Sequence, residues 1–202
     1  MILKIINKCF LIISRNFWIF LNRIRLYSHR IKYGNNCNLF NSVYLRNEGC
    51  ISIGDDFLLT SGGGYNPLCR NVRGAIVANH YANITIGNHV HVSSPCIWAR
   101  KSIVIGNDVK IGGDTIIIDS DAHSLNFLDR RFDRDEDDSR NACSREVVIG
   151  NDVLIGTRCL ILKGVHIGDR TIIGAGSVVV CDIPEDSIAV GNPCRVIRKI
   201  NE

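Results

Sequence analysis

The residues of this sequence best suited to chemistry lie in the segment DSDAHSL, at positions 119–125. Its His123 can take up and release a proton near neutral pH, as a general base must. Alternate residues of an extended strand point to one side, so Asp121 could hold the imidazole ring in one tautomer, and Asp119 is the other candidate. A lone histidine is more often an exposed loop residue, but His123 stands where a repeat in the sequence stops, which favours a functional role.

That repeat has a period of six residues and is strictest between Ile149 and Ile183. A helix repeats its apolar face every 3.6 residues and a strand every two, so neither explains the period. One short strand followed by one turn does explain it, when such units stack as a single-stranded parallel β-helix. The aliphatic residues at every sixth position, four of them followed by glycine, are Ile149, Ile155, Ile161, Ile167, Ile173 and Val179.

The same spacing, with interruptions, extends over residues 33–117 and predicts about six coils, at three six-residue units to a coil. The next aliphatic residue after Ile117 would be residue 123, the histidine, and the repeat resumes only at Ile149. Two loops are therefore expected to leave the coil, at residues 61–75 and 124–146. The second loop is densely charged and long for a compact fold, and such loops are more often functional than idle.

Residues 1–30 are expected to form an amphipathic helix ahead of a single β-helix domain at 31–202. Arg15 interrupts the apolar residues, so no uncharged run approaches the roughly 20 residues that a transmembrane helix needs. Two interpretations stay open: residues 1–28 lie in a membrane interface, or they pack on the protein itself. At the other end, residues 185–202 are expected to cap the stack. The polar residues that gather on one side of the helix are Lys4, Lys8, Arg15, Asn22 and Arg25.

The composition excludes several classes of function. The net charge is only +4, and no dense basic stripe is interleaved with aromatic residues, so a nucleic-acid partner is not expected. The nine cysteines form no C-x-x-C pair, which indicates reduced thiols in the cytoplasm, with neither disulfides nor a zinc site. His89 and His91 could share one face of a strand, but a third converging ligand is missing, so no metal is expected.

Three segments together resemble a known family. The repeat at 149–183, the ending GAGSVVVCDIP at 174–184 and the tail AVGNPCRVIRKI at 189–200 resemble hexapeptide-repeat acyltransferases. The resemblance is to the sugar O-acetyltransferases, including galactoside and maltose acetyltransferases, and DSDAHSL is most similar to capsule and lipopolysaccharide O-acetyltransferases. It covers residues 33–200. It implies a left-handed coil, against the usual right-handed preference of parallel crossovers, and a homotrimer with active sites between subunits.

The resemblance also implies an activity and its residues. The expected reaction is transfer of acetyl from acetyl-CoA to a carbohydrate hydroxyl, with His123 in the position of the family's essential general base. The pairs Gly156-Thr157 and Gly174-Ala175 match positions where small residues expose backbone amides to the pantetheine arm of acetyl-CoA. Arg198 matches a basic tail residue near the 3′-phosphate. Val180-Cys181 stands where relatives often carry Thr-Lys, so one charge near that phosphate is missing.

Two other functions remain as alternatives. An N-acyltransferase acting on an amino sugar nucleotide would use the same scaffold, although such enzymes often add a separate nucleotide-binding domain that this sequence lacks. A non-catalytic β-helix scaffold would keep only the coil. In either case the protein is expected in the cytoplasm, free or peripheral on the inner face of the cell membrane.

Overall fold

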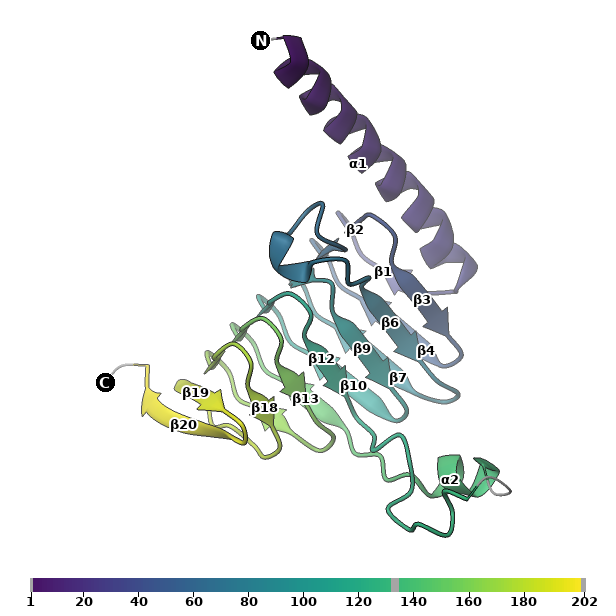
Figure 1. Ribbon diagram of the computed structural model, residues 1–202, viewed down its shortest axis with the longest axis vertical. Helices are drawn as coiled ribbons and strands as arrows, with labels where there is room; N and C mark the ends of the chain where they lie inside the picture. The colour runs from purple at the N-terminus through teal and green to yellow at the C-terminus, as the bar shows by residue number, and fades with distance from the viewer. Residues whose placement is uncertain (1, 132–134, 201–202) are drawn as a thin grey trace.

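The chain folds as a left-handed parallel β-helix of six coils with one long helix at its N-terminal end (Figure 1). The computed structural model describes the backbone of residues 2–131 and 135–200. Each coil contributes one strand to each of three sheets, called A, B and C. This confirms the β-helix and its six coils predicted from the six-residue repeat.

The strands of sheet A are β1 (Lys32–Tyr33), β4 (Cys50–Ile53), β7 (Asn83–Ile86), β10 (Ser102–Ile105), β13 (Val147–Ile149) and β16 (His166–Ile167). Those of sheet B are β2 (Asn38–Phe40), β5 (Leu58–Thr60), β8 (His91–Ser93), β11 (Lys110–Ile111), β14 (Leu154–Ile155), β17 (Ile172–Ile173), β19 (Ser187–Gly191) and β20 (Cys194–Lys199). Those of sheet C are β3 (Tyr44–Asn47), β6 (Ala75–Ala78), β9 (Cys96–Ala99), β12 (Ile116–Ile118), β15 (Leu160–Ile161) and β18 (Val178–Val179).

The repeated aliphatic residues fill the inside of the coil. Ile149, Ile155 and Ile161 come from one coil, one from each sheet, and none is more than 1% exposed. Each is paired in register with an aliphatic residue of the next coil, as Ile149 is with Ile167. Burial of one such side chain contributes about 1.5–3 kcal/mol, so the core is built from many equal increments.

A ladder of side-chain hydrogen bonds runs along the edge between sheets A and B. In each coil a Gly-Asn or Gly-Asp pair turns the corner, and the side-chain oxygen accepts a hydrogen bond from the backbone N–H of the equivalent residue one coil earlier. The five N···O distances are 2.6–2.9 Å. The six residues of this ladder are Asn35, Asp55, Asn88, Asn107, Asn151 and Asp169.

Helix α1 (Ile2–Ser28) lies across the N-terminal end of the stack and extends beyond it (Figure 1). Leu26 is fully buried, and Asn22 donates from Nδ2 to the carbonyls of Leu39 and Asn41, both at 2.9 Å. The Arg15 guanidinium lies 5.6 Å from the centroid of the Phe40 ring. Part of the polar side of the helix therefore faces the coil. No helix within the described residues is both long and apolar enough to cross a membrane.

The last coil is covered by the chain itself. Strand β20 turns back antiparallel onto β19, and Cys194 at its start is fully buried. The 61–74 loop, which contains a short 3-10 helix (Pro67–Cys69), folds back over the edge between sheets B and C, where Cys69 is fully buried near Gly113.

The ladder makes a stability prediction. A Cβ on Gly106 would lie 2.6 Å from the carbonyl oxygen of Gly150 and 2.8 Å from Oδ1 of Asn151, so the coils must separate to accept it. We expect Gly106→Ala to lower the free energy of unfolding by about 1–3 kcal/mol, measured by urea denaturation. The matched control is Gly64→Ala in the 61–74 loop, where a Cβ would have no neighbour within 4 Å. Equal stability of the two variants would contradict the account of close coil stacking.

Candidate active site

The long loop that interrupts the repeat leaves the edge between sheets C and A, here called the CA edge. It starts after β12 and returns at β13. Its two legs pair with each other: Asp121 N donates to Cys143 O at 3.0 Å, and Arg145 N donates to Asp119 O at 2.8 Å. The paired legs carry helix α2 (Asp135–Asn141) away from the coil (Figure 1).

Asp119 fixes the start of this loop. Its carboxylate is fully buried and accepts hydrogen bonds from the backbone N–H groups of Arg100, Lys101 and Ser102, at 2.6–2.7 Å. Burial raises the pKa of the Asp119 carboxyl, and the three N–H groups oppose that rise because they stabilise the anion. Asp119 therefore ties the loop to the preceding coil.

Asp121 has a different partner. Its Oδ1 accepts a hydrogen bond from Nζ of Lys163, and both side chains are only about one fifth exposed, at 20% and 19%. The expectation that Asp119 or Asp121 holds the His123 ring is therefore corrected, since both carboxylates are engaged elsewhere in the coil.

The partner of His123 is Asp138, on helix α2. The distance from Nδ1 of His123 to Oδ2 of Asp138 is 2.6 Å, and Oδ1 of the same carboxylate accepts from Ser124 N, also at 2.6 Å. The Asp138 side chain is 14% exposed and the His123 side chain 71% exposed. One carboxylate thus holds both the ring and the backbone next to it.

This contact determines the tautomer of the neutral ring. The hydrogen bond with His123 holds the pKa of Asp138 below its usual value, so Asp138 is an anion at neutral pH. A carboxylate only accepts hydrogen bonds, and Nδ1 must therefore carry the hydrogen. Nε2 keeps its lone pair and is the nitrogen able to accept a proton.

Arg100 connects the two segments that meet at His123. Its guanidinium donates to the carbonyl of Ala122 at 3.1 Å, and to the carbonyl and hydroxyl of Ser139 at 2.7 Å each. Ala122 precedes the histidine and Ser139 follows Asp138, so one side chain fixes both partners of the contact. Nothing in the six-residue repeat marks Arg100 or Asp138, because they meet His123 only through the fold of the loop.

The predicted coenzyme-binding residues lie on a different edge, between sheets B and C, here called the BC edge. Gly156 and Gly174 stack there in successive coils, and a Cβ on Gly156 would lie 2.4 Å from the backbone nitrogen of Ala175. A cavity of about 370 Å³ beside them is bounded by the 61–74 loop, through Asn66 and Leu68, and by Lys110, Leu154, Gly156 and Thr157.

The backbone amides of this edge only partly match the expectation. The N–H groups of Gly156 and Gly174 donate to the carbonyls of Ile173 and Ala189, both at 2.8 Å, so these two amides are not open to a ligand. Those of Thr157 and Ala175, one residue further on, donate to no group within the described part of the chain. The glycines allow successive coils to approach closely, and the backbone N–H groups of the residues after them are open donors.

A second tail arginine lies nearer to this edge than Arg198 does. Arg198 pairs with Ile188, whereas Arg195 pairs with Val190, the residue whose Cγ1 would lie 2.6 Å from a Cβ on Gly174. The guanidinium of Arg195 is 3.6 Å from Sγ of Cys181. A positive charge therefore stands beside the position at which the sequence had suggested that one was missing.

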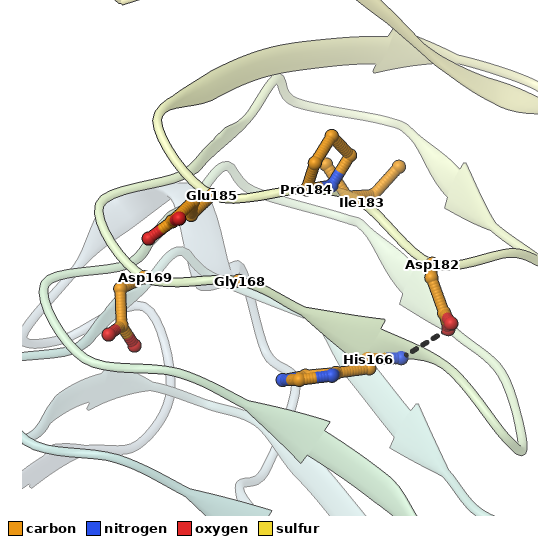
Figure 2. Close-up of a pocket in the computed structure, with 7 residues that line it drawn as sticks. All are labelled: His166, Gly168, Asp169, Asp182, Ile183, Pro184 and Glu185. Atoms are coloured by element: carbon orange, nitrogen blue, oxygen red, sulfur yellow. Dashed lines mark hydrogen bonds between the residues drawn. The ribbon is translucent and has the colours of Figure 1, made fainter.

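Two other groups of titratable side chains make contacts within the coil. A cavity in the last coil has a volume of about 420 Å³, and at its wall Oδ1 of Asp182 accepts from His166 N at 2.8 Å. Figure 2 shows the residues that line this cavity. There Asp169 belongs to the edge ladder, and Glu185 pairs with an arginine at 2.8 Å. His89 turns a corner with φ 56° and lies 3.1 Å from Asp108. Among the described residues no three potential ligands gather as a metal site would require.

The fold and this pair of edges define a class of protein, the hexapeptide β-helix enzymes. The family model described as bacterial transferase hexapeptide (six repeats) matches residues 146–181. The chain is 33% identical to WbbJ of Escherichia coli K12, assigned provisionally as a lipopolysaccharide biosynthesis O-acetyl transferase. The aligned region of 168 residues covers 82% of this chain and 81% of WbbJ. It is 35% identical to the galactoside O-acetyltransferase of the same organism over 57% of each chain.

Solved structures give the same fold. AntD, an N-acyltransferase from Bacillus cereus in complex with dTDP and 3-hydroxybutyryl-CoA, has a TM-score of 0.63 at 20% identity over 88% of this chain and 87% of its own. The hexapeptide-repeat acetyltransferase VCA0836 of Vibrio cholerae has a TM-score of 0.52 at 24% identity, over 85% of this chain and 74% of its own. The chain belongs to the hexapeptide-repeat acyltransferase family, and it is an acyltransferase.

The role of Asp119 can be tested by its effect on stability. We expect Asp119→Asn to lower the free energy of unfolding by about 1–3 kcal/mol, because the amide leaves at least one N–H of residues 100–102 without an acceptor. Urea denaturation measures this. Asp137→Asn, on the same loop but half-exposed, serves as the control and should change stability by less than about 0.5 kcal/mol. An Asp119→Asn variant as stable as the control would contradict the anchoring role.

Proposed function

We propose that this protein is an acyl-CoA-dependent O-acetyltransferase that moves acetyl from acetyl-CoA to a hydroxyl of a carbohydrate, with His123 as the general base. The observation that carries the proposal is the contact between His123 and Asp138, at 2.6 Å, which leaves Nε2 as the proton acceptor. The identity to WbbJ over most of both chains supports a surface polysaccharide precursor as the acceptor, and oxygen as the atom acylated.

In the proposed mechanism, Nε2 of His123 takes the proton of the acceptor hydroxyl as its oxygen attacks the thioester carbonyl. Asp138 stabilises the imidazolium that forms, because its carboxylate already accepts the Nδ1 hydrogen. The tetrahedral intermediate then collapses, the carbon–sulfur bond breaks, and the imidazolium returns the proton to the leaving thiolate of coenzyme A. The products are an acetyl ester and free coenzyme A.

Coenzyme A is proposed to bind along the BC edge. The open N–H groups of Thr157 and Ala175 can donate to the amide carbonyls of the pantetheine arm. Gly156 and Gly174 place no side chain between the arm and the backbone. Arg195 and Arg198 are both exposed and can bind the phosphates of the nucleotide. No metal takes part in the proposed reaction.

The two halves of this site suggest a homotrimer. Thr157 on the BC edge and Lys163, the partner of Asp121 on the CA edge, are separated by the width of sheet C. Six residues of extended chain span up to about 20 Å, too far for His123 to reach a thioester bound at the BC edge of its own subunit. A neighbouring subunit that sets its BC edge against this CA edge would complete the site.

The protein is proposed to work in the cytoplasm, on the inner face of the cell membrane. Eight of the nine cysteines are described, and all eight are free, which fits a reducing compartment. Contact of residues 1–28 with the membrane would bring lipid-linked carbohydrate within reach.

His123 and Asp138 can be tested together. His123→Ala should lower kcat for acetyl transfer by about 10²–10⁴ without loss of folding, measured by release of the coenzyme A thiol with a panel of free and lipid-linked sugars. Asp138→Asn should lower kcat less, with an unchanged KM for acetyl-CoA, because it disturbs the ring and not the thioester. Asp138→Glu should recover part of the loss.

Each outcome separates the candidates. Full activity in His123→Ala would remove this residue from the mechanism. Acetylation of amino sugars in preference to hydroxyl acceptors would favour the N-acyltransferase. A folded oligomer that consumes no acetyl-CoA with any acceptor would favour the non-catalytic scaffold.

The shared site makes a second prediction. Ala175→Trp should abolish activity, because an exposed indole on the BC edge would block the pantetheine arm. His123→Ala and Ala175→Trp subunits, each inactive alone, should regain about a quarter of wild-type activity after unfolding and refolding together, because random assembly pairs intact histidines with intact edges. Activity that stays absent in the mixed trimers would mean that each site lies within one subunit.

A further inference from the structure

Helix α1 carries an apolar stripe that the described part of the chain leaves exposed. The stripe consists of Ile13, Phe17, Phe20, Ile24 and Tyr27. These residues follow one another at intervals of four, three, four and three, which places them on one side of the helix. Each side chain is at least 49% exposed, and Tyr27 is 82% exposed. The stripe is about 20 Å long, at 1.5 Å per helical residue.

The stripe faces away from the coil. Asn22 and Leu26, on the opposite side of the helix, are buried against the first coil, at 1% and 0% exposure. The helix lies across the end of the stack and not along it (Figure 1). The stripe therefore faces outward from the N-terminal end of the coil, in the direction in which the coils are stacked.

The charge around the stripe has one sign. Residues 1–47 contain eight of the 24 Lys and Arg residues and none of the 20 Asp and Glu residues, so the remainder of the chain has 16 basic and 20 acidic residues. Arg23, Arg30 and Lys32 are exposed at this end. Arg23 lies one turn from both Phe20 and Tyr27. The apolar stripe is thus flanked by cationic groups, and the excess of acidic charge lies elsewhere.

Two occupants could cover such a stripe: a second copy of the helix or a lipid surface. Because α1 crosses the end of its own stack, copies of α1 cannot lie parallel to the stacking axis, as a parallel helix bundle around that axis would require. A second copy would also bring more positive charge to a helix without a single acidic residue. An anionic bilayer offers apolar depth to the stripe and negative headgroups to the arginines.

We propose that this face of α1 docks into the headgroup region of an anionic bilayer and holds the coil end-on to the membrane. The helix lies in the plane of the interface, with Phe17 and Phe20 at its centre. The loop that carries His123 leaves the fourth coil, which lies about 15 Å from the first coil at roughly 4.8 Å per coil. His123 therefore lies about 25 Å above the axis of α1. This inference rests on the proposed function only for its consequence: the acceptor is a carbohydrate presented on a membrane-anchored carrier.

The test is flotation of the full-length protein with vesicles of phosphatidylcholine, alone or mixed with phosphatidylglycerol. We expect binding to the mixed vesicles, weakened by high salt, and little binding to phosphatidylcholine alone. Phe17→Ala/Phe20→Ala should lower the bound fraction at least about tenfold. The matched control is Ile12→Ala, which truncates a 46%-exposed apolar residue of the same helix outside the stripe and should change binding less than about twofold.

Oligomeric state and activity on a soluble acceptor are measured on the same variants. Binding that is equal in the stripe variant and the control would overturn the proposal. So would a change of oligomeric state in the stripe variant without a change in vesicle binding, because a second copy would then cover the stripe. Unchanged turnover of a soluble acceptor by a stripe variant that no longer floats supports the proposal, and it separates membrane docking from the proposed chemistry.

Discussion

The close stacking of one coil on the next is the constraint on which the rest of the structure depends. At the edge between sheets A and B each side-chain oxygen reaches the backbone N–H of the coil before it, at 2.6–2.9 Å. That reach needs a residue without a side chain immediately before each ladder residue, since a Cβ on Gly150 would lie 2.3 Å from Oδ1 of Asp169. The glycines and the amide or acid residues are therefore one device, repeated in every coil.

The candidate active site lies at a different edge, between sheets C and A, where the chain leaves the coil while the ladder continues from Asn107 to Asn151. After β12 the chain leaves the coil, and the backbone groups at the departure point still need partners because the next strand is 28 residues away in the sequence. Asp119 accepts from three backbone N–H groups at the same corner one coil earlier, and the paired legs of the loop hydrogen-bond to each other. A rigid coil with one anchored loop can hold an imidazole and a carboxylate in fixed relation, and few other positions in so regular a fold could do so.

The sequence predicted what is periodic and missed what is not. The six-residue repeat was enough for the β-helix and its six coils, because every coil repeats the same local rule. His123 could be singled out because it breaks that rule. Asp138 could not be linked to it, since 15 residues of charged loop offer several equivalent carboxylates and only the fold of that loop selects one. The same limit applies to Arg195, whose position beside Cys181 depends on the turn between β19 and β20.

Helix α1 illustrates a different limit. Its sequence is apolar on more than one side, so the membrane-facing and the protein-packed interpretations could not be separated by periodicity. In the structure one side packs on the coil through Asn22 and Leu26, while the stripe from Ile13 to Tyr27 remains exposed. Packing on the protein therefore accounts for only part of the helix. Membrane contact stays a prediction.

The register between coils has a consequence for how such a protein can change in length. Val148 pairs with His166 and Ile149 with Ile167, an offset of 18 residues, whereas Ser102 pairs with Asn83 at an offset of 19 and Ile103 with Val147 at an offset of 44. Extra residues are therefore taken up at the corners and in loops, and the stack lengthens only by whole coils. If α1 is the membrane contact, each coil added between α1 and His123 would move His123 one strand spacing further from the membrane. The number of coils would then set how far from the membrane an acceptor must reach.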